Sequence, residues 1–108
     1  MTLRIADTAE DAAVEAHALL RALRGHGKSK DQIARALESA VLNLEEGGGR
    51  FGKDKEFHYT VAYASAREGM RGLRLLGRKV HIDATGLASV LGKLDSVCAV
   101  TWTLIHRR

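Results

Sequence analysis

Residues 8–46, with the sequence TAEDAAVEAHALLRALRGHGKSKDQIARALESAVLNLEE, predict two antiparallel helices joined by a short turn. Apolar residues recur there at intervals of three and four, as on the buried side of an amphipathic helix. Thr8 and Ser29 are the predicted N-caps, and Gly25 and Gly47 the predicted ends. The two stripes consist of Ala9, Ala12, Ala13, Ala16, Leu19, Leu20 and Leu23, then of Ile33, Ala36, Leu37, Ala40, Val41 and Leu44.

The rest of the chain predicts a small sheet with connecting helices. Apolar and polar residues alternate from Phe57 to Tyr63, which is typical of a strand with one buried face. Gly69 and Gly72 each cost a helix about 1 kcal/mol, which weakens the helical pattern around them. The predicted elements are a glycine-rich linker at 47–55, strands at 57–63, 80–83 and 98–105, helices at 66–76 and 86–95, and a short edge strand at 2–6.

This order predicts a single α+β domain over residues 1–108. In it the helical hairpin precedes a strand-and-helix half, residues 56–108, with a sheet of about three strands. Hydrophobic residues make up 45% of the chain and charged residues 28%, as in an ordinary globular protein. No apolar run reaches the length of a membrane span, and no signal peptide opens the chain. We therefore expect a cytoplasmic protein that is not inserted into a membrane.

The motifs that resemble catalytic or cofactor sites are weak. Cys98 is the only cysteine, which excludes an internal disulfide and a cysteine zinc cage. The spacing of Gly47, Gly49 and Gly52 matches a dinucleotide fingerprint, but no strand precedes it and no helix is predicted to follow directly. His58, His81 and Asp83 lie on polar faces of predicted strands, where they could form a metal or acid–base site. We expect no cofactor, no metal and no enzymatic activity.

Two segments resemble known families. Residues 82–91, IDATGLASVL, are similar to the switch helix of STAS domains, and this resemblance implies a phosphorylated hydroxyl at Thr85 that controls partner binding. The N-terminal part is similar to a ribbon–helix–helix repressor, which implies that Thr2 and Arg4 read bases from a strand in the major groove. Both resemblances cover only part of the chain.

A row of arginines is the clearest functional signal. Arg67, Arg71, Arg74 and Arg78 are spaced four, three and four apart, so they share one side of a helix. With Lys79 they form a basic block that contains only Glu68 as an acid. Residues 1–46 carry six Lys/Arg and eight Asp/Glu, whereas residues 47–108 carry eleven and five. Arginine forks bind phosphate and carboxylate groups, so the row predicts a polyanion site.

An alternative is that the acidic first helix neutralises this row through Glu10, Asp11 and Glu15.

We expect a small regulatory or binding protein whose partner is nucleic acid or an acidic protein surface. Tyr59, Tyr63 and Trp102 are interpreted as core residues, so no base-stacking platform is expected and the expected mode is contact with the nucleic-acid backbone. The alternatives are a protein–protein effector such as an inhibitor, an antitoxin-like partner or a phage-borne regulator, and the STAS-like switch. The alanine-rich helices leave a homodimer open.

Overall fold

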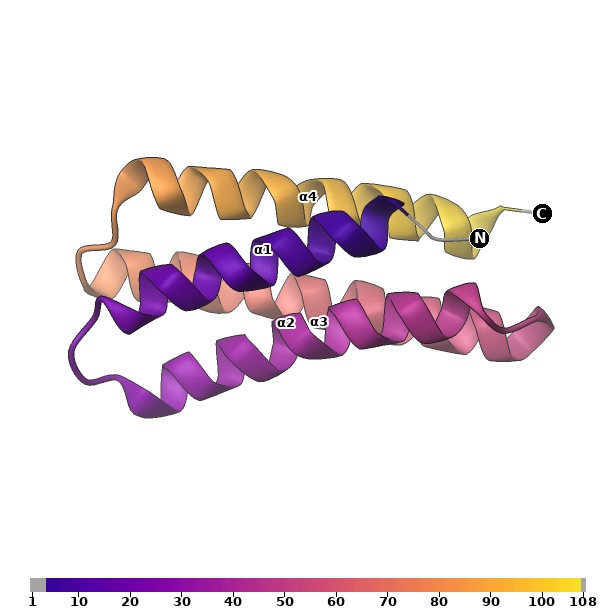
Figure 1. The fold of residues 1–108 in the computed structure, drawn as a ribbon, viewed down its shortest axis with the longest axis horizontal. Helices are drawn as coiled ribbons and strands as arrows, with labels where there is room; N and C mark the ends of the chain where they lie inside the picture. The colour runs from indigo at the N-terminus through magenta and orange to yellow at the C-terminus, as the bar shows by residue number, and fades with distance from the viewer. Residues whose placement is uncertain (1–3, 108) are drawn as a thin grey trace.

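The computed structural model describes residues 4–107 and consists of four α-helices (Figure 1). They are α1 (Arg4–Arg21), α2 (Gly27–Gly48), α3 (Gly52–Lys79) and α4 (Ala84–His106). No strand occurs in the described part of the chain, so the α+β prediction is wrong. The predicted helical hairpin is confirmed as α1 and α2, although both helices begin earlier than expected and α2 ends one residue later than Gly47.

The helices run up and down in chain order and form one bundle (Figure 1). Each helix packs against the next, and α4 closes the ring by packing against α1. Helices α1 and α3 lie diagonally across the bundle: none of their Cα atoms come within 8 Å of each other, and their buried side chains share one core cluster. The bundle measures 43 × 23 × 19 Å. This arrangement fixes which charged faces can meet: the outer side of α3 is out of reach of α1.

The core runs along the inside of the bundle in two clusters. One cluster lies toward the α1–α2 turn and includes Leu37, Leu73 and Leu94. The other lies toward the opposite end and includes Leu44, Tyr59 and Val97. Buried alanines of α1, α2 and α3 lie among these larger side chains, and a Cβ at Gly69 or Gly72 of α3 would stand less than 3 Å from a side chain of α2, so α2 and α3 approach each other closely.

The predicted strand at 57–63 is the N-terminal half of α3. Its alternation of large apolar residues with polar or small ones imitates the period of a strand, but the side chains follow a helical period in the structure. Tyr59 and Ala62 point into the core, whereas Phe57 is 60% exposed. Because alanine counts equally well toward a buried helix face and toward a weakly polar strand face, the pattern alone could not separate the two.

The other two predicted strands are also wrong. Residues 98–105 continue α4, with Thr101 buried and Val100 and Trp102 exposed. Residues 80–83 form the turn between α3 and α4, and the Asp83 carboxylate accepts a hydrogen bond of 2.8 Å from the backbone N–H of Gly86 as the N-cap of α4. The helices expected at 66–76 and 86–95 are parts of these longer helices. Of the edge strand predicted at 2–6, residues 4–6 belong to α1 instead, and Thr2 and Leu3 lie outside the described residues.

The predicted linker at 47–55 shortens to a three-residue connection, Gly49 to Phe51. Gly47 is buried in α2, where a Cβ would stand 2.7 Å from the Tyr59 ring. At the other turn, α2 begins after His26, which adopts a left-handed φ of 58°, so Ser29 lies inside the helix and is not its cap. Thr8 is likewise inside α1, where its hydroxyl donates to the carbonyl of Arg4.

Helix α4 is apolar enough to cross a membrane by length and composition alone, with a mean hydropathy of 1.3 over 18 residues. The expectation that no segment reaches this length therefore does not hold. One such helix is weak evidence, because a core helix has the same composition. Val90, Leu94 and Val97 are buried against the bundle, and Lys93 forms an ion pair with Glu15 of α1. These contacts hold one side of α4 against the bundle, and 22% of the apolar window is buried.

Candidate nucleic-acid interface

The arginine stripe, defined as Arg67, Arg71, Arg74 and Arg78, lies on the outer side of α3. All four side chains are exposed, and so is the neighbouring Lys79. The opposite side of the same segment carries the buried residues Ala66, Met70, Leu73 and Leu76. The segment therefore belongs to a helix with one core face and one basic face, as its spacing predicts.

No carboxylate lies within ion-pair distance of the arginine stripe among residues 4–107. The ion pairs of this part of the chain join Arg50 to Glu46 and Asp54, and Lys93 to Glu15. Glu15 is engaged with α4, where it also accepts a hydrogen bond of 2.7 Å from the hydroxyl of Ser89. Because none of these ion pairs joins α1 to the outer side of α3, the acids of α1 do not neutralise the stripe. That alternative is wrong.

Three of the stripe arginines line a hollow of about 240 Å³ between α3 and α4, here called the arginine hollow. Arg67, Arg71 and Arg74 form one wall together with Tyr63, and Asp95 and Cys98 of α4 form the other. Its lining is mostly polar. Arg67 is held in place, since its Nη1 donates a hydrogen bond of 3.1 Å to the Tyr63 hydroxyl and its guanidinium stands 5.7 Å from the Tyr63 ring centre.

A second hollow of about 370 Å³, here called the aromatic hollow, continues from the first toward the C-terminal end of α4. Tyr63, Asp95 and Cys98 line both hollows, and Ala99 and Trp102 complete the second. Trp102 is 50% exposed and stacks on His106 with ring centres 3.9 Å apart. The interpretation of Tyr63 and Trp102 as core residues is therefore wrong: Tyr63 is half-buried and Trp102 lies at the surface beside the arginines.

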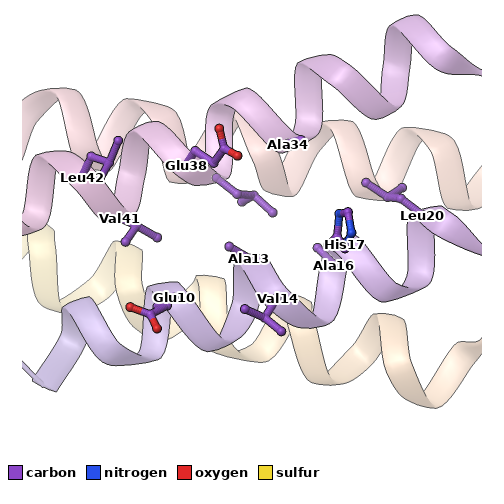
Figure 2. Close-up of a pocket in the computed structure, with 11 residues that line it drawn as sticks. Glu10, Ala13, Val14, Ala16, His17, Leu20, Ala34, Glu38, Val41 and Leu42 are labelled. Atoms are coloured by element: carbon purple, nitrogen blue, oxygen red, sulfur yellow. The ribbon is translucent and has the colours of Figure 1, made fainter.

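A separate apolar groove of about 450 Å³ opens between α1 and α2 (Figure 2). It is lined by Ala13, Val14 and His17 of α1 and by Val41 and Leu42 of α2. Val14 and Leu42 are 63% and 67% exposed. The groove carries no basic side chain apart from His17, so it is distinct in chemistry and position from the arginine stripe. The homodimer considered from the sequence stays a prediction.

The remaining predicted site residues do not come together. His58 lies near the start of α3, whereas His81 and Asp83 lie in the turn beyond its far end, so the metal or acid–base site considered for them is wrong. Among residues 4–107, no group of three His, Cys, Asp or Glu side chains could hold a metal ion. The spacing of Gly47, Gly49 and Gly52 falls on a helix–turn–helix connection, which is not the context of a dinucleotide site.

Thr85 is exposed in the first turn of α4, whose cap is Asp83. A STAS domain requires a sheet, and the helical bundle removes the basis for carrying its phosphorylation switch over to Thr85. The ribbon–helix–helix interpretation fails as well, because Arg4 begins a helix and does not lie in a strand. Cys98 packs with its Sγ 3.8 Å from the Sδ of Met70, and burial raises the pKa of its thiol above the ordinary value. The thiol is thus neutral and poorly suited to be a nucleophile.

No family model matches the chain, and no curated protein matches it. A solved structure from Bacteroides thetaiotaomicron VPI-5482, a protein of unknown function from the S23 ribosomal protein family, is similar in fold. The superposition has a TM-score of 0.83 and covers 94% of this chain and 98% of the other, at 22% sequence identity. At this identity the likeness shows the four-helix architecture alone.

Proposed function

We propose that this chain is a small non-enzymatic protein that binds the phosphate backbone of nucleic acid through the arginine stripe, with Lys79 at its end. The observation that carries the proposal is the row of four exposed arginines without an acidic partner within residues 4–107. Like charges one helical turn apart repel by about 0.2–0.5 kcal/mol per pair, so a bound polyanion would relieve an existing cost.

Arginine suits this role because its planar fork binds two phosphate oxygens at once. The stripe is part of a helix whose other side is core, so the arginines are presented by a rigid element. Contacts of this kind position a protein on the backbone and do not read the sequence of bases. The ribosomal family name of the similar structure is in keeping with a nucleic-acid partner, although that protein is itself of unknown function.

A salt titration against mixed-sequence DNA and RNA tests the proposal. Binding should weaken steeply as salt rises, because each phosphate contact releases a counterion. Arg71→Ala and Arg74→Ala should weaken binding by similar factors on unrelated sequences, and each should lower the slope of log K against log salt by about 0.7–0.9. Arg21→Ala, which removes an exposed arginine from α1, the helix diagonal to α3, is the matched control and should leave the slope nearly unchanged.

The melting temperature of the same variants must be measured beside binding. Arg71 and Arg74 are exposed and unpaired in the described residues, so their removal should change stability by no more than about 0.5 kcal/mol. If no nucleic acid binds even at low salt, the proposal is wrong. An acidic protein surface or the protein–protein effector would then take its place.

A further inference from the structure

We propose that the joined arginine and aromatic hollows between α3 and α4 form a binding site for one unpaired nucleotide, so that the chain prefers single-stranded nucleic acid over a duplex. This inference rests on the proposed function and adds to it the class of nucleic acid. The phosphate would bind at Arg67, Arg71 and Arg74, and the base would stack against Trp102.

The first argument is the order in which the arginines and the tryptophan line the cleft. The arginines line only the hollow toward the middle of α3, and Trp102 lines only the hollow toward the end of α4. Tyr63, Asp95 and Cys98 are common to both, so the two hollows form one continuous cleft. A nucleotide has the same order, with an anionic phosphate at one end and a flat aromatic base at the other.

The second argument is that Trp102 is supported by a neighbouring ring of its own helix. Trp102 stacks on His106 with an interplanar angle of 23°, and the imidazole Nδ1 lies 2.8 Å from the backbone carbonyl oxygen of Trp102. The indole nevertheless remains half exposed. A large aromatic ring that is ordered but not buried is the kind of surface on which unpaired bases stack, and such stacking is tolerant of sequence.

The third argument concerns Asp95, the exposed acid at the junction of the hollows. Its carboxylate repels a phosphate in either hollow, and only the arginine hollow has cations that offset this repulsion, so the phosphate is favoured there. It can also accept a hydrogen bond from the exocyclic amino group of a base, as carboxylates do with the N4 amino group of cytosine. In a paired duplex the faces of the base are engaged in stacking with the neighbouring base pairs, so Trp102 would have no free base to stack on.

Trp102 is the only tryptophan of the chain, so its fluorescence reports directly on the site. The experiment compares an RNA strand of mixed sequence with the same strand annealed to its complement, at equal low salt. The single strand should bind roughly tenfold more tightly or better, which corresponds to one stacked base, and should quench the emission of Trp102. The duplex should bind through the arginine stripe alone and should leave the emission unchanged.

Variants separate this inference from the proposed function. Trp102→Ala should abolish the preference for the single strand and leave duplex affinity unchanged, whereas Trp102→Phe should retain most of the preference. Arg71→Ala should weaken both ligands. Because Trp102 is half exposed, the variants should fold, and circular dichroism checks this.

Equal binding of both ligands without quenching overturns the nucleotide site and leaves the proposed function standing. Binding of neither ligand overturns both. A preference for the single strand that survives in Trp102→Ala also overturns the site, since stacking on Trp102 would then not be its cause.

Discussion

Gly69 of α3 lies directly against Leu37 of α2: a Cβ at position 69 would stand 2.4 Å from the Cδ2 atom of Leu37. Gly72, one turn further on, is in the same position relative to Ile33, where a Cβ would stand 2.7 Å from Cγ1. Close to these contacts, the hydroxyls of Ser39 and Ser65 lie 2.8 Å apart across the same pair of helices. The glycines that weaken α3 as an isolated helix therefore allow its close packing on α2.

Gly69→Ala should destabilise the protein by about 1–3 kcal/mol, because both the Cδ2 and the Cγ of Leu37, a side chain that is 2% exposed, would have to shift to admit the methyl group. Gly92→Ala in α4 is the matched control. A Cβ there meets nothing within 4 Å, so the helix should gain up to about 1 kcal/mol from the better propensity of alanine. Urea unfolding of both variants tests this, and stabilisation by Gly69→Ala would show that the two helices are not packed as described.

Leu37→Ala should cost about 2–5 kcal/mol through lost burial and the cavity left behind. The same substitution at Leu42, on the same helix but 67% exposed, should change stability by no more than about 0.5 kcal/mol. The comparison of melting temperatures holds the chemistry of the substitution constant and varies only burial. Similar losses for both variants would mean that the groove around Leu42 is covered in solution.

The sequence predicts the helices with long, regular stripes, and it fails where small residues blur the period. In α1 and α2 the leucines and alanines recur at helical spacing, and both helices form as expected. In α3 the segment 57–63 alternates large apolar residues with polar or small ones. Seven positions are too few to distinguish the period of a strand, 2.0 residues, from that of a helix, 3.6 residues. The glycines that break the pattern at 69 and 72 are explained only by the neighbouring helix.

The arginine part of the candidate site was predictable from the sequence, and the aromatic part was not. The spacing of Arg67, Arg71, Arg74 and Arg78 puts them on one helix face without any tertiary information. The exposure of Trp102 was not predictable, because it depends on which side of α4 faces α3. Once residues 98–105 are interpreted as a strand, Trp102 falls on the inner face with Val100. The wrong secondary structure thus concealed the aromatic part of the cleft.

Thr101→Val should raise the free energy of unfolding by about 1 kcal/mol. Within residues 4–107, the Thr101 hydroxyl is buried without a hydrogen-bond partner, and the side chain is fully buried in α4. An unsatisfied buried polar group costs about 1–3 kcal/mol, and valine has nearly the same shape without that cost. Thr103→Val is the control, because its exposed hydroxyl bonds to the carbonyl of Ala99 and its replacement should be close to neutral. A loss of stability in Thr101→Val would indicate that the hydroxyl has a partner in solution.

The ion pair between Glu15 of α1 and Lys93 of α4 should make stability depend on pH in the acidic range. Hydrogen bonds from Lys93, and then from Ser89, lower the pKa of the Glu15 carboxyl below its ordinary value. A carboxyl with a lowered pKa in the folded state stabilises the fold above the unfolded pKa of about 4.3, and this contribution is lost as pH falls through the folded value.

Both side chains are about one-third exposed, so a double-mutant cycle of Glu15→Gln and Lys93→Met should give a coupling of only about 0.2–1 kcal/mol at neutral pH. The coupling should shrink at about pH 3 and in high salt. A coupling that stays constant from neutral to acidic pH would show that these two charges do not hold α1 against α4.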